Sequence, residues 1–229
     1  IVPLALLIVL SAAVGVGPAA RYKVAQFWLW LSIQAARVIL GIEYRTQGFD
    51  NLPVGQTSPA ILLVKHQSTY ETFLMPAIMP HPLAYVFKRE LLYVPFFGWA
   101  IGLLDMVHID RSQRAKAFAK VVEQGKALLE KGVWVIMFPE GTRTRDGSLG
   151  VFKDGAFRLA IEHQVPILPM VVDGTRTALA AGGWLMNVTE AQVKVLEPIP
   201  TTGMTSADIG PLRDRVRTLI ADELAALRA

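Results

Sequence analysis

A histidine and a glutamate stand five positions apart in the segment KHQSTYE, directly after the apolar run ILLV. We expect His66 in a loop and Glu71 in the first turn of the helix that follows, where the carboxylate can reach the imidazole. A carboxylate so placed fixes one imidazole tautomer and leaves the other ring nitrogen free to accept a proton from a hydroxyl group. This predicts a general-base dyad. Taken alone, such a pair is more often structural, so other segments must support this interpretation.

A second polar segment, FPEGTRT, ends another apolar run that begins at Val133. It contains Glu140, Gly141, Thr142 and Arg143, at the kind of strand end where open α/β sheets bind ligands. Glycine permits close approach of the backbone to a ligand, and amides in such a turn can face an anion. Arginine can bind a phosphate. The segment therefore predicts part of a binding site, with Glu140 in a supporting role.

Two further cations, Lys88 and Arg111, also follow predicted strands. If these loops converge near His66, the pocket suits a phosphate attached to a hydroxyl-bearing substrate. No metal site is predicted, because the sequence has neither an H-x3-H pair nor a compact carboxylate cluster. The remaining histidines, His81, His108 and His163, are interpreted as structural or surface residues.

The elements that must position these residues alternate between short β-rich runs and helical patterns, which predicts an α/β fold with a central mixed or mostly parallel sheet flanked by helices. Residues 44–229 are expected to form the catalytic domain. A helix capped by Ser112 should end near Gly132, and a C-terminal amphipathic helix should begin near Ala207. Strands are expected at 60–64, 83–87, 105–109, 133–138, 167–172 and 192–196.

The N-terminal residues 1–43 predict a hydrophobic, membrane-associated helical hairpin. The first 20 carry no charge, and a helix of that length can cross a hydrocarbon core of about 30 Å. Arg21 and Lys23 interrupt the run, and Trp28 and Trp30 in the second segment suit the headgroup region. Both a spanning and an interfacial arrangement remain open.

Composition excludes several classes of protein. The 229 residues contain no cysteine and are 52% hydrophobic, which excludes disorder, a disulfide scaffold and a thiolate metal site. The net charge of +4 is compatible with an anionic membrane, a phosphorylated substrate or nucleic acid. Nucleic acid is the weakest of these partners and is not predicted, because the cations are dispersed and no binding module is visible.

Together these motifs resemble the lysophosphatidic acid acyltransferase family, also called 1-acylglycerol-3-phosphate acyltransferases, within the glycerolipid acyltransferase superfamily. The matching blocks, in chain order, are H-x4-E at His66, KRELLYVPFFG at Lys88, a block ending in I-D-R at Arg111, FPEGTR at Phe138 and VPILP at Val165. Ordered blocks with plausible spacing are far more specific than any one alone. Glu71 stands where the family usually has aspartate, and we expect the dyad to persist with altered geometry.

The resemblance implies transfer of a fatty acyl group from acyl-CoA or acyl-carrier protein to the free hydroxyl of lysophosphatidic acid, giving phosphatidic acid. His66 would be the general base and Glu71 would orient it, while Lys88, Arg111 and Arg143 would bind the phosphate. Backbone amides near Gly141 would stabilise the oxyanion. The implied location is the cytoplasmic face of the inner or plasma membrane, with no cofactor. Two alternatives stay open: acylation of another lysolipid, and a non-catalytic lipid-binding protein of the same fold.

Overall fold

The computed structural model describes residues 2–53, 58–110 and 114–229. A seven-stranded sheet has the order β1-β7-β6-β2-β5-β3-β4, and every neighbouring pair is parallel except β6 and β7. The α/β class with a mostly parallel mixed sheet is therefore confirmed. The strands are β1 (Ile42–Gln47), β2 (Ile61–Val64), β3 (Leu83–Lys88), β4 (Val107–Ile109), β5 (Trp134–Met137), β6 (Ile167–Asp173) and β7 (Thr189–Val195).

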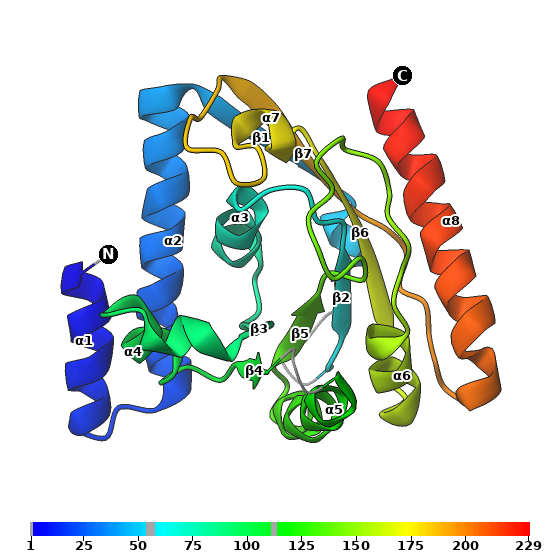
Figure 1. Cartoon of the computed structure of the whole chain (residues 1–229), viewed down its shortest axis with the longest axis horizontal. Helices are drawn as coiled ribbons and strands as arrows, with labels where there is room; N and C mark the ends of the chain where they lie inside the picture. The colour runs from blue at the N-terminus through cyan, green and yellow to red at the C-terminus, as the bar shows by residue number, and fades with distance from the viewer. Residues whose placement is uncertain (1, 54–57, 111–113) are drawn as a thin grey trace.

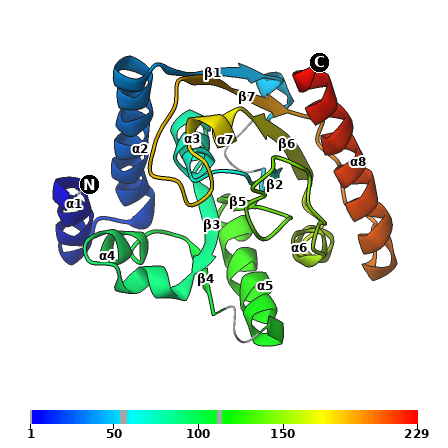
Figure 2. The ribbon, with the colours of Figure 1, turned by 45° about the horizontal axis from the view of Figure 1, so that its top comes forward.

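Helices cover both faces of this sheet (Figures 1 and 2). The helices are α1 (Val2–Ala13), α2 (Pro18–Leu40), α3 (Tyr70–Ile78), α4 (Phe97–Ile101), α5 (Arg114–Glu130), α6 (Gly155–Glu162), α7 (Thr175–Ala178) and α8 (Ile209–Arg228). Short 3-10 turns lie at Phe49–Asn51, Arg89–Tyr93 and Ser206–Asp208.

Strand β2 lies near the middle of the sheet and is fully buried, so its side chains supply both hydrophobic cores. Ile61 and Leu63 join the core formed with α5, α6 and α8, whereas Leu62 and Val64 join the core formed with α2, α3 and α7. This alternation follows from the two-residue period of a strand. Because β2 is buried on both faces, its position is fixed, and so is the point at which the loop beginning with Lys65 leaves the sheet.

Strand β1 lies outside the predicted strands, and the boundary expected between residues 43 and 44 falls inside it. Its sequence IEYRTQ has one fully buried apolar residue, Ile42, and the remainder is polar or partly exposed. An edge strand with so little buried apolar surface gives a weak sequence pattern. It pairs with β7 in parallel register, with Ile42 opposite Thr189.

The N-terminal segment forms α1 and α2, but the first apolar run does not continue as one helix. Helix α1 ends at Ala13, Gly15 adopts a positive φ of 81°, and Pro18 begins α2 at a position where its missing N–H costs nothing. Within the part of the chain that is described, no helix has the combined length and apolarity needed to cross a bilayer.

Helix α2 packs on α3, and this packing determines the orientation of several of its side chains. The side-chain amide of Gln26 donates to the Pro76 and Met79 carbonyls at 2.9 and 3.1 Å. Trp28 turns inward against Phe73, with ring centroids 5.3 Å apart, whereas Trp30 is exposed. One tryptophan of the predicted headgroup pair therefore faces the protein.

The C-terminal helix α8 has the predicted amphipathic pattern, because Ile209, Leu212, Val216, Ile220 and Leu224 are buried whereas Leu219 is exposed. Its far end is held by Arg228, whose guanidinium donates to Asp173 at the end of β6 at 2.7 and 3.0 Å. Burial acts to raise the pKa of Asp173, but the hydrogen bonds and charge of Arg228 hold it below its usual range. The predicted helix cap Ser112 lies outside the described residues.

Candidate active site

His66 and Glu71 contact each other directly. His66 lies two residues beyond β2, Glu71 lies in the first turn of α3, and His66 Nδ1 is 2.7 Å from a Glu71 carboxylate oxygen. Because a carboxylate accepts hydrogen bonds, this contact places the ring proton on Nδ1 and leaves Nε2 as the acceptor of a neutral imidazole. The pair has the geometry of a base and its orienting carboxylate.

The carboxylate of Glu71 is completely buried and is held by three more donors. The backbone amides of Gln67 and Ser68 donate to the oxygen that contacts His66, at 2.6 and 3.1 Å. Thr175 Oγ1 donates to the other oxygen at 2.6 Å. A buried carboxylate with four donors is held in one rotamer, so its contact with His66 is preorganised.

Thr175 was not identified from the sequence, since it lies 104 positions from Glu71. It begins α7 directly after β6, and Gly174 turns the chain there with a φ of 78°. The segment DGT after an apolar strand carries the same strand-end signal as the predicted site segments, and that signal was available in the sequence.

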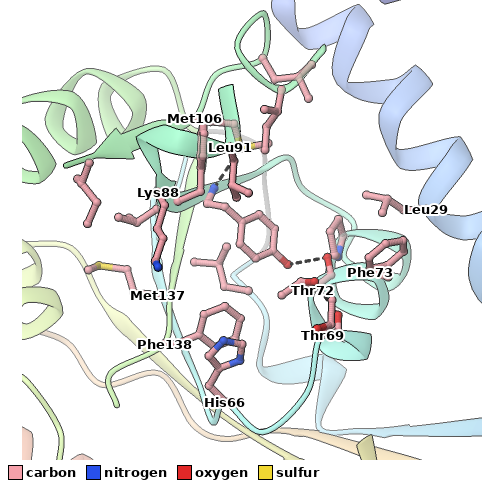
Figure 3. Close-up of a pocket in the computed structure, with 18 of the residues that line it drawn as sticks. Leu29, His66, Thr69, Thr72, Phe73, Lys88, Leu91, Met106, Met137 and Phe138 are labelled. Carbon is pink, nitrogen blue, oxygen red and sulfur yellow. Dashed lines mark hydrogen bonds between the residues drawn. The ribbon is translucent and has the colours of Figure 1, made fainter. Parts of the chain in front are cut away.

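The imidazole of His66 stacks on Phe138, the last residue before the PEGTR turn, with ring centroids 3.8 Å apart and planes inclined by 15°. Figure 3 shows the two rings side by side at one end of the pocket. The stack prevents the histidine from swinging about its Cα–Cβ bond. It therefore reinforces the orientation that Glu71 imposes.

Glu140 joins two loops through backbone amides. Its carboxylate accepts from His66 N and from Gly150 N, each at 2.8 Å, and the side chain is nearly inaccessible to solvent. Thr144 N also donates to His66 O at 3.1 Å, so the His66 loop and the PEGTR turn are fixed to each other. Glu140 thus helps to fix the relative positions of these two loops.

Gly141 adopts a φ of 69°, and a side chain there would collide with Lys153, whose Nζ would lie 2.6 Å from a Cβ atom. Its amide donates to Phe138 O at 2.9 Å. The expectation that amides near Gly141 face an oxyanion thus needs correction for Gly141 and Thr144, because both amides already have backbone acceptors.

Lys65 is an unusual feature, because its side chain is completely buried beside the dyad. Its ammonium donates to Gln67 Oε1 at 3.1 Å and to Thr144 Oγ1 at 3.4 Å. Burial lowers the pKa of Lys65 from its usual value, while the charges of Glu140 and Glu71 act in the opposite direction. The charged form of Lys65 is thus favoured by the two buried carboxylates and disfavoured by its own burial.

A cavity of about 1410 Å³ opens beside His66. The predicted residues Lys88, Gly141, Thr142 and Arg143 line it, whereas Glu140 stands behind its wall. Figure 3 shows Lys88 extending from the end of β3 into the pocket toward the side where Phe138 lies. Arg111 lies outside the described residues. Two lining cations were missed by sequence reasoning, Arg145 and Lys153, because neither directly follows a strand.

Arg143 has a further property that distinguishes it from a surface arginine. Its Nε is buried and, among the described residues, finds no hydrogen-bond partner. A buried guanidinium nitrogen without an acceptor is costly, and an anionic ligand would satisfy it. At this end, then, the cavity has donors for an anion next to a base.

Away from His66 the cavity is apolar. Its wall combines side chains from α1, α2, α3, α4 and the strand ends, including Ile8, Leu29, Phe73, Leu104 and Met106. In Figure 3, Leu29, Phe73 and Met106 lie on the side away from His66. The site can therefore hold a molecule with an anionic end, a hydroxyl group near the base and a long apolar tail. Among the residues described, no group of His, Cys, Asp or Glu is arranged to hold a metal ion.

Comparison with known proteins identifies the family. Residues 43–173 match the acyltransferase family model, which covers more than half of the chain. A 1-acyl-sn-glycerol-3-phosphate acyltransferase from Pseudomonas aeruginosa is 39% identical over 209 residues, covering 91% of this chain and 79% of that protein. The human alpha enzyme of the same name is 35% identical, covering 82% of this chain and 66% of its own length.

The fold has a solved counterpart. The crystal structure of the 1-acyl-sn-glycerophosphate (LPA) acyltransferase PlsC from Thermotoga maritima superposes with a TM-score of 0.79 at 26% sequence identity. The match covers 97% of this chain and 88% of the Thermotoga chain. Family model, sequence relatives and fold agree, and the chain belongs to the 1-acyl-sn-glycerol-3-phosphate acyltransferase family.

Proposed function

We propose that this protein transfers a fatty acyl group from acyl-CoA or acyl-carrier protein to the free hydroxyl of 1-acyl-sn-glycerol 3-phosphate, which yields phosphatidic acid. The observation that carries the proposal is the His66–Glu71 contact in a single cavity that His66, Lys88 and Arg143 line together with many apolar side chains. The substrate has groups that suit each of these features: a phosphate, a hydroxyl and an acyl chain. The names of the relatives support the same substrate.

In the proposed reaction, Nε2 of His66 takes the proton of the acceptor hydroxyl as its oxygen attacks the thioester carbonyl carbon. The imidazolium is stabilised by Glu71, to which it is hydrogen-bonded at 2.7 Å. The tetrahedral intermediate then collapses, the carbon–sulfur bond breaks, and the proton passes from Nε2 to the departing sulfur. No covalent intermediate with the protein forms, and the dyad returns to its initial state.

The phosphate is proposed to bind where Lys88 and Arg143 line the cavity, with Arg111 as a further candidate from its motif. Arg145 and Lys153 line the same cavity and add positive charge. Since a guanidinium can bind phosphate through two parallel hydrogen bonds, Arg143 is the strongest of these candidates. Its unpartnered Nε supports this assignment.

We further propose that residues 1–43 attach the enzyme to the bilayer as an interfacial helical hairpin, with the catalytic domain on the cytoplasmic side, where soluble acyl thioesters are available. Exposed apolar side chains support this attachment, and they lie on both helices: Leu6, Leu7, Leu10, Phe27, Trp30 and Leu31. Helices with such a face can bind in the plane of the interface.

The test is a thiol-release assay in detergent micelles, with acyl-CoA or acyl-carrier protein as donor and a panel of lysolipids as acceptors. Wild-type protein should release thiol with lysophosphatidic acid, and His66→Ala should lower turnover by at least about 10²-fold. His163→Ala is the matched control, because His163 follows α6 and does not line the cavity. Thiol release that survives His66→Ala unchanged would remove the dyad mechanism. If another lysolipid is preferred, that lysolipid and not lysophosphatidic acid is the acceptor substrate.

A further inference from the structure

The segment between α7 and β7, residues 180–188, has unusual surface chemistry. Trp184 is 96% exposed, Leu185 82% and Val188 76%, so large apolar groups stand in water. From Thr177 to Thr189 the sequence contains no charged residue. A tryptophan so exposed has no role in the packing of the domain, which points to something outside the protein that covers it.

The base of this segment is nevertheless held firmly. Leu179 and Met186 form an antiparallel bridge, and Asn187 N donates to Ala178 O at 3.0 Å. Asn187 Nδ2 donates to Thr177 O at 3.1 Å. Residues 180–185 therefore project from a fixed base, the neck, which consists of residues 177–179 and 186–187. The exposure of Trp184 results from this arrangement.

The neck is also connected to the candidate active site. Ser68 Oγ donates to Leu179 O at 2.6 Å, and Ser68 N donates to Glu71, the carboxylate that contacts His66. Ala181 and Gly182 line the cavity, whereas Trp184 and Leu185 do not. The projecting residues thus stand beside the cavity without forming its wall.

The segment continues an apolar surface of the N-terminal helices. A Cβ atom on Gly41 would lie 3.5 Å from Val188, and the residues before Gly41 end α2 with the exposed side chains Val38, Ile39 and Leu40. Both ribbon views place the segment next to α2, on the side of the molecule away from α8 (Figures 1 and 2). The same side carries the helices proposed to attach to the bilayer.

We propose that residues 180–188 form a second membrane-contacting element, which inserts Trp184 and Leu185 into the bilayer interface beside the cavity. The proposal rests on the proposed function, since both the acceptor and the product are then lipids of that bilayer. An indole fits the interfacial region, where its ring contacts acyl chains while its N–H stays hydrated. Insertion next to the cavity shortens the path of a lysolipid from bilayer to base.

The absence of cysteine from the chain allows a direct test. Leu185→Cys is labelled with an environment-sensitive fluorophore and mixed with vesicles of phosphatidylethanolamine and phosphatidylglycerol. We expect a blue-shifted emission and protection from a water-soluble quencher. Thr218→Cys is the matched control, because Thr218 is exposed on α8, and its label should remain in water.

Each outcome of this experiment decides the proposal. A label at Leu185 that stays accessible to the quencher while the protein co-sediments with vesicles overturns it, as does failure to co-sediment. A blue shift that depends on protein concentration and needs no vesicles also overturns it, since a second copy of the chain would then cover the segment.

An activity arm separates this proposal from the proposed function. Replacing Trp184 and Leu185 together by serine should weaken partitioning onto vesicles by about tenfold or more. Turnover of acceptor embedded in vesicles should fall accordingly, while turnover in detergent micelles should stay at the wild-type level. Absence of turnover by wild type in both vesicles and micelles would contradict the proposed function. The labelling experiment would still test membrane insertion of residues 180–188 independently.

Discussion

Replacing Glu71 by glutamine tests whether the carboxylate acts by shape or by charge. The amide oxygen can keep the contacts with His66 Nδ1, Gln67 N and Ser68 N, and the amide nitrogen would face Thr175 Oγ1, which can accept. The fold should therefore persist. The variant lacks the negative charge that stabilises the imidazolium formed during the reaction.

The magnitude follows from Coulomb's law. Unit charges whose centres lie about 4 Å apart attract by about 4 kcal/mol at an effective dielectric constant near 20. An amide dipole recovers part of this, so a loss of about 3 kcal/mol corresponds to roughly 10²-fold in kcat. Glu71→Asp keeps the charge but shortens the arm by about 1.5 Å. We expect it to retain more activity than Glu71→Gln, with a loss on the order of tenfold.

The assay measures thiol release at saturating acceptor for the three proteins at one fixed pH, and thermal unfolding confirms that each is folded. The ranking wild type, then Glu71→Asp, then Glu71→Gln is the expected result. If Glu71→Gln is folded and turns over as fast as wild type, the charge has no part in catalysis, and Glu71 would be a structural residue only.

Three other substitutions test further parts of the site. Thr175→Val removes one donor to Glu71 and should cost about 1.5–3 kcal/mol of stability, with a smaller loss of kcat than Glu71→Gln; urea unfolding and thiol release together check this. Arg143→Ala should lower kcat/KM for lysophosphatidic acid by about 10- to 150-fold and leave a phosphate-free monoacylglycerol acceptor little affected; equal losses on both acceptors would refute phosphate binding. Burial lowers the pKa of Lys65 in the folded protein, so between that lowered pKa and 10.5 the unfolded chain binds more protons. The stability of wild type relative to Lys65→Met should therefore rise with pH across this window and stay constant below it, as measured by urea unfolding at several pH values.

The predictable parts of the fold are those with strong local patterns. The buried strands β2, β5 and β6 are largely apolar runs, and polar residues occur at or within three positions of their ends, so both the sheet and the position of the site at its strand ends could be predicted. Helix α3 begins at Tyr70, which puts Glu71 in its first turn as expected. The contact between His66 and Glu71 is predictable because the two residues are only five positions apart in the sequence.

The parts that were not predictable depend on contacts between distant segments. Thr175 reaches Glu71 across 104 positions, and Gly150 reaches Glu140 from a loop without regular structure. Sequence periodicity indicates which residues are buried but does not indicate which acceptor a backbone amide finds. For that reason the hydrogen bond from the Gly141 amide to Phe138 O could be determined only from the structure.

The attachment of α1 has a consequence for how the cavity can open. Among the described residues, the cluster that holds α1 has three buried members, Ala5, Ile8 and Ala100, with partly buried side chains packed against them, and it is separate from the two cores that cover the sheet. Few buried contacts mean a low free energy of local unfolding, so amide hydrogens in α1 should exchange with solvent earlier than those of β2 or β6. Because Ala5 and Ile8 also line the cavity, each such opening would remove one of its walls. A long acyl chain would then be able to enter from the side, and the strand ends that hold His66 would not have to move.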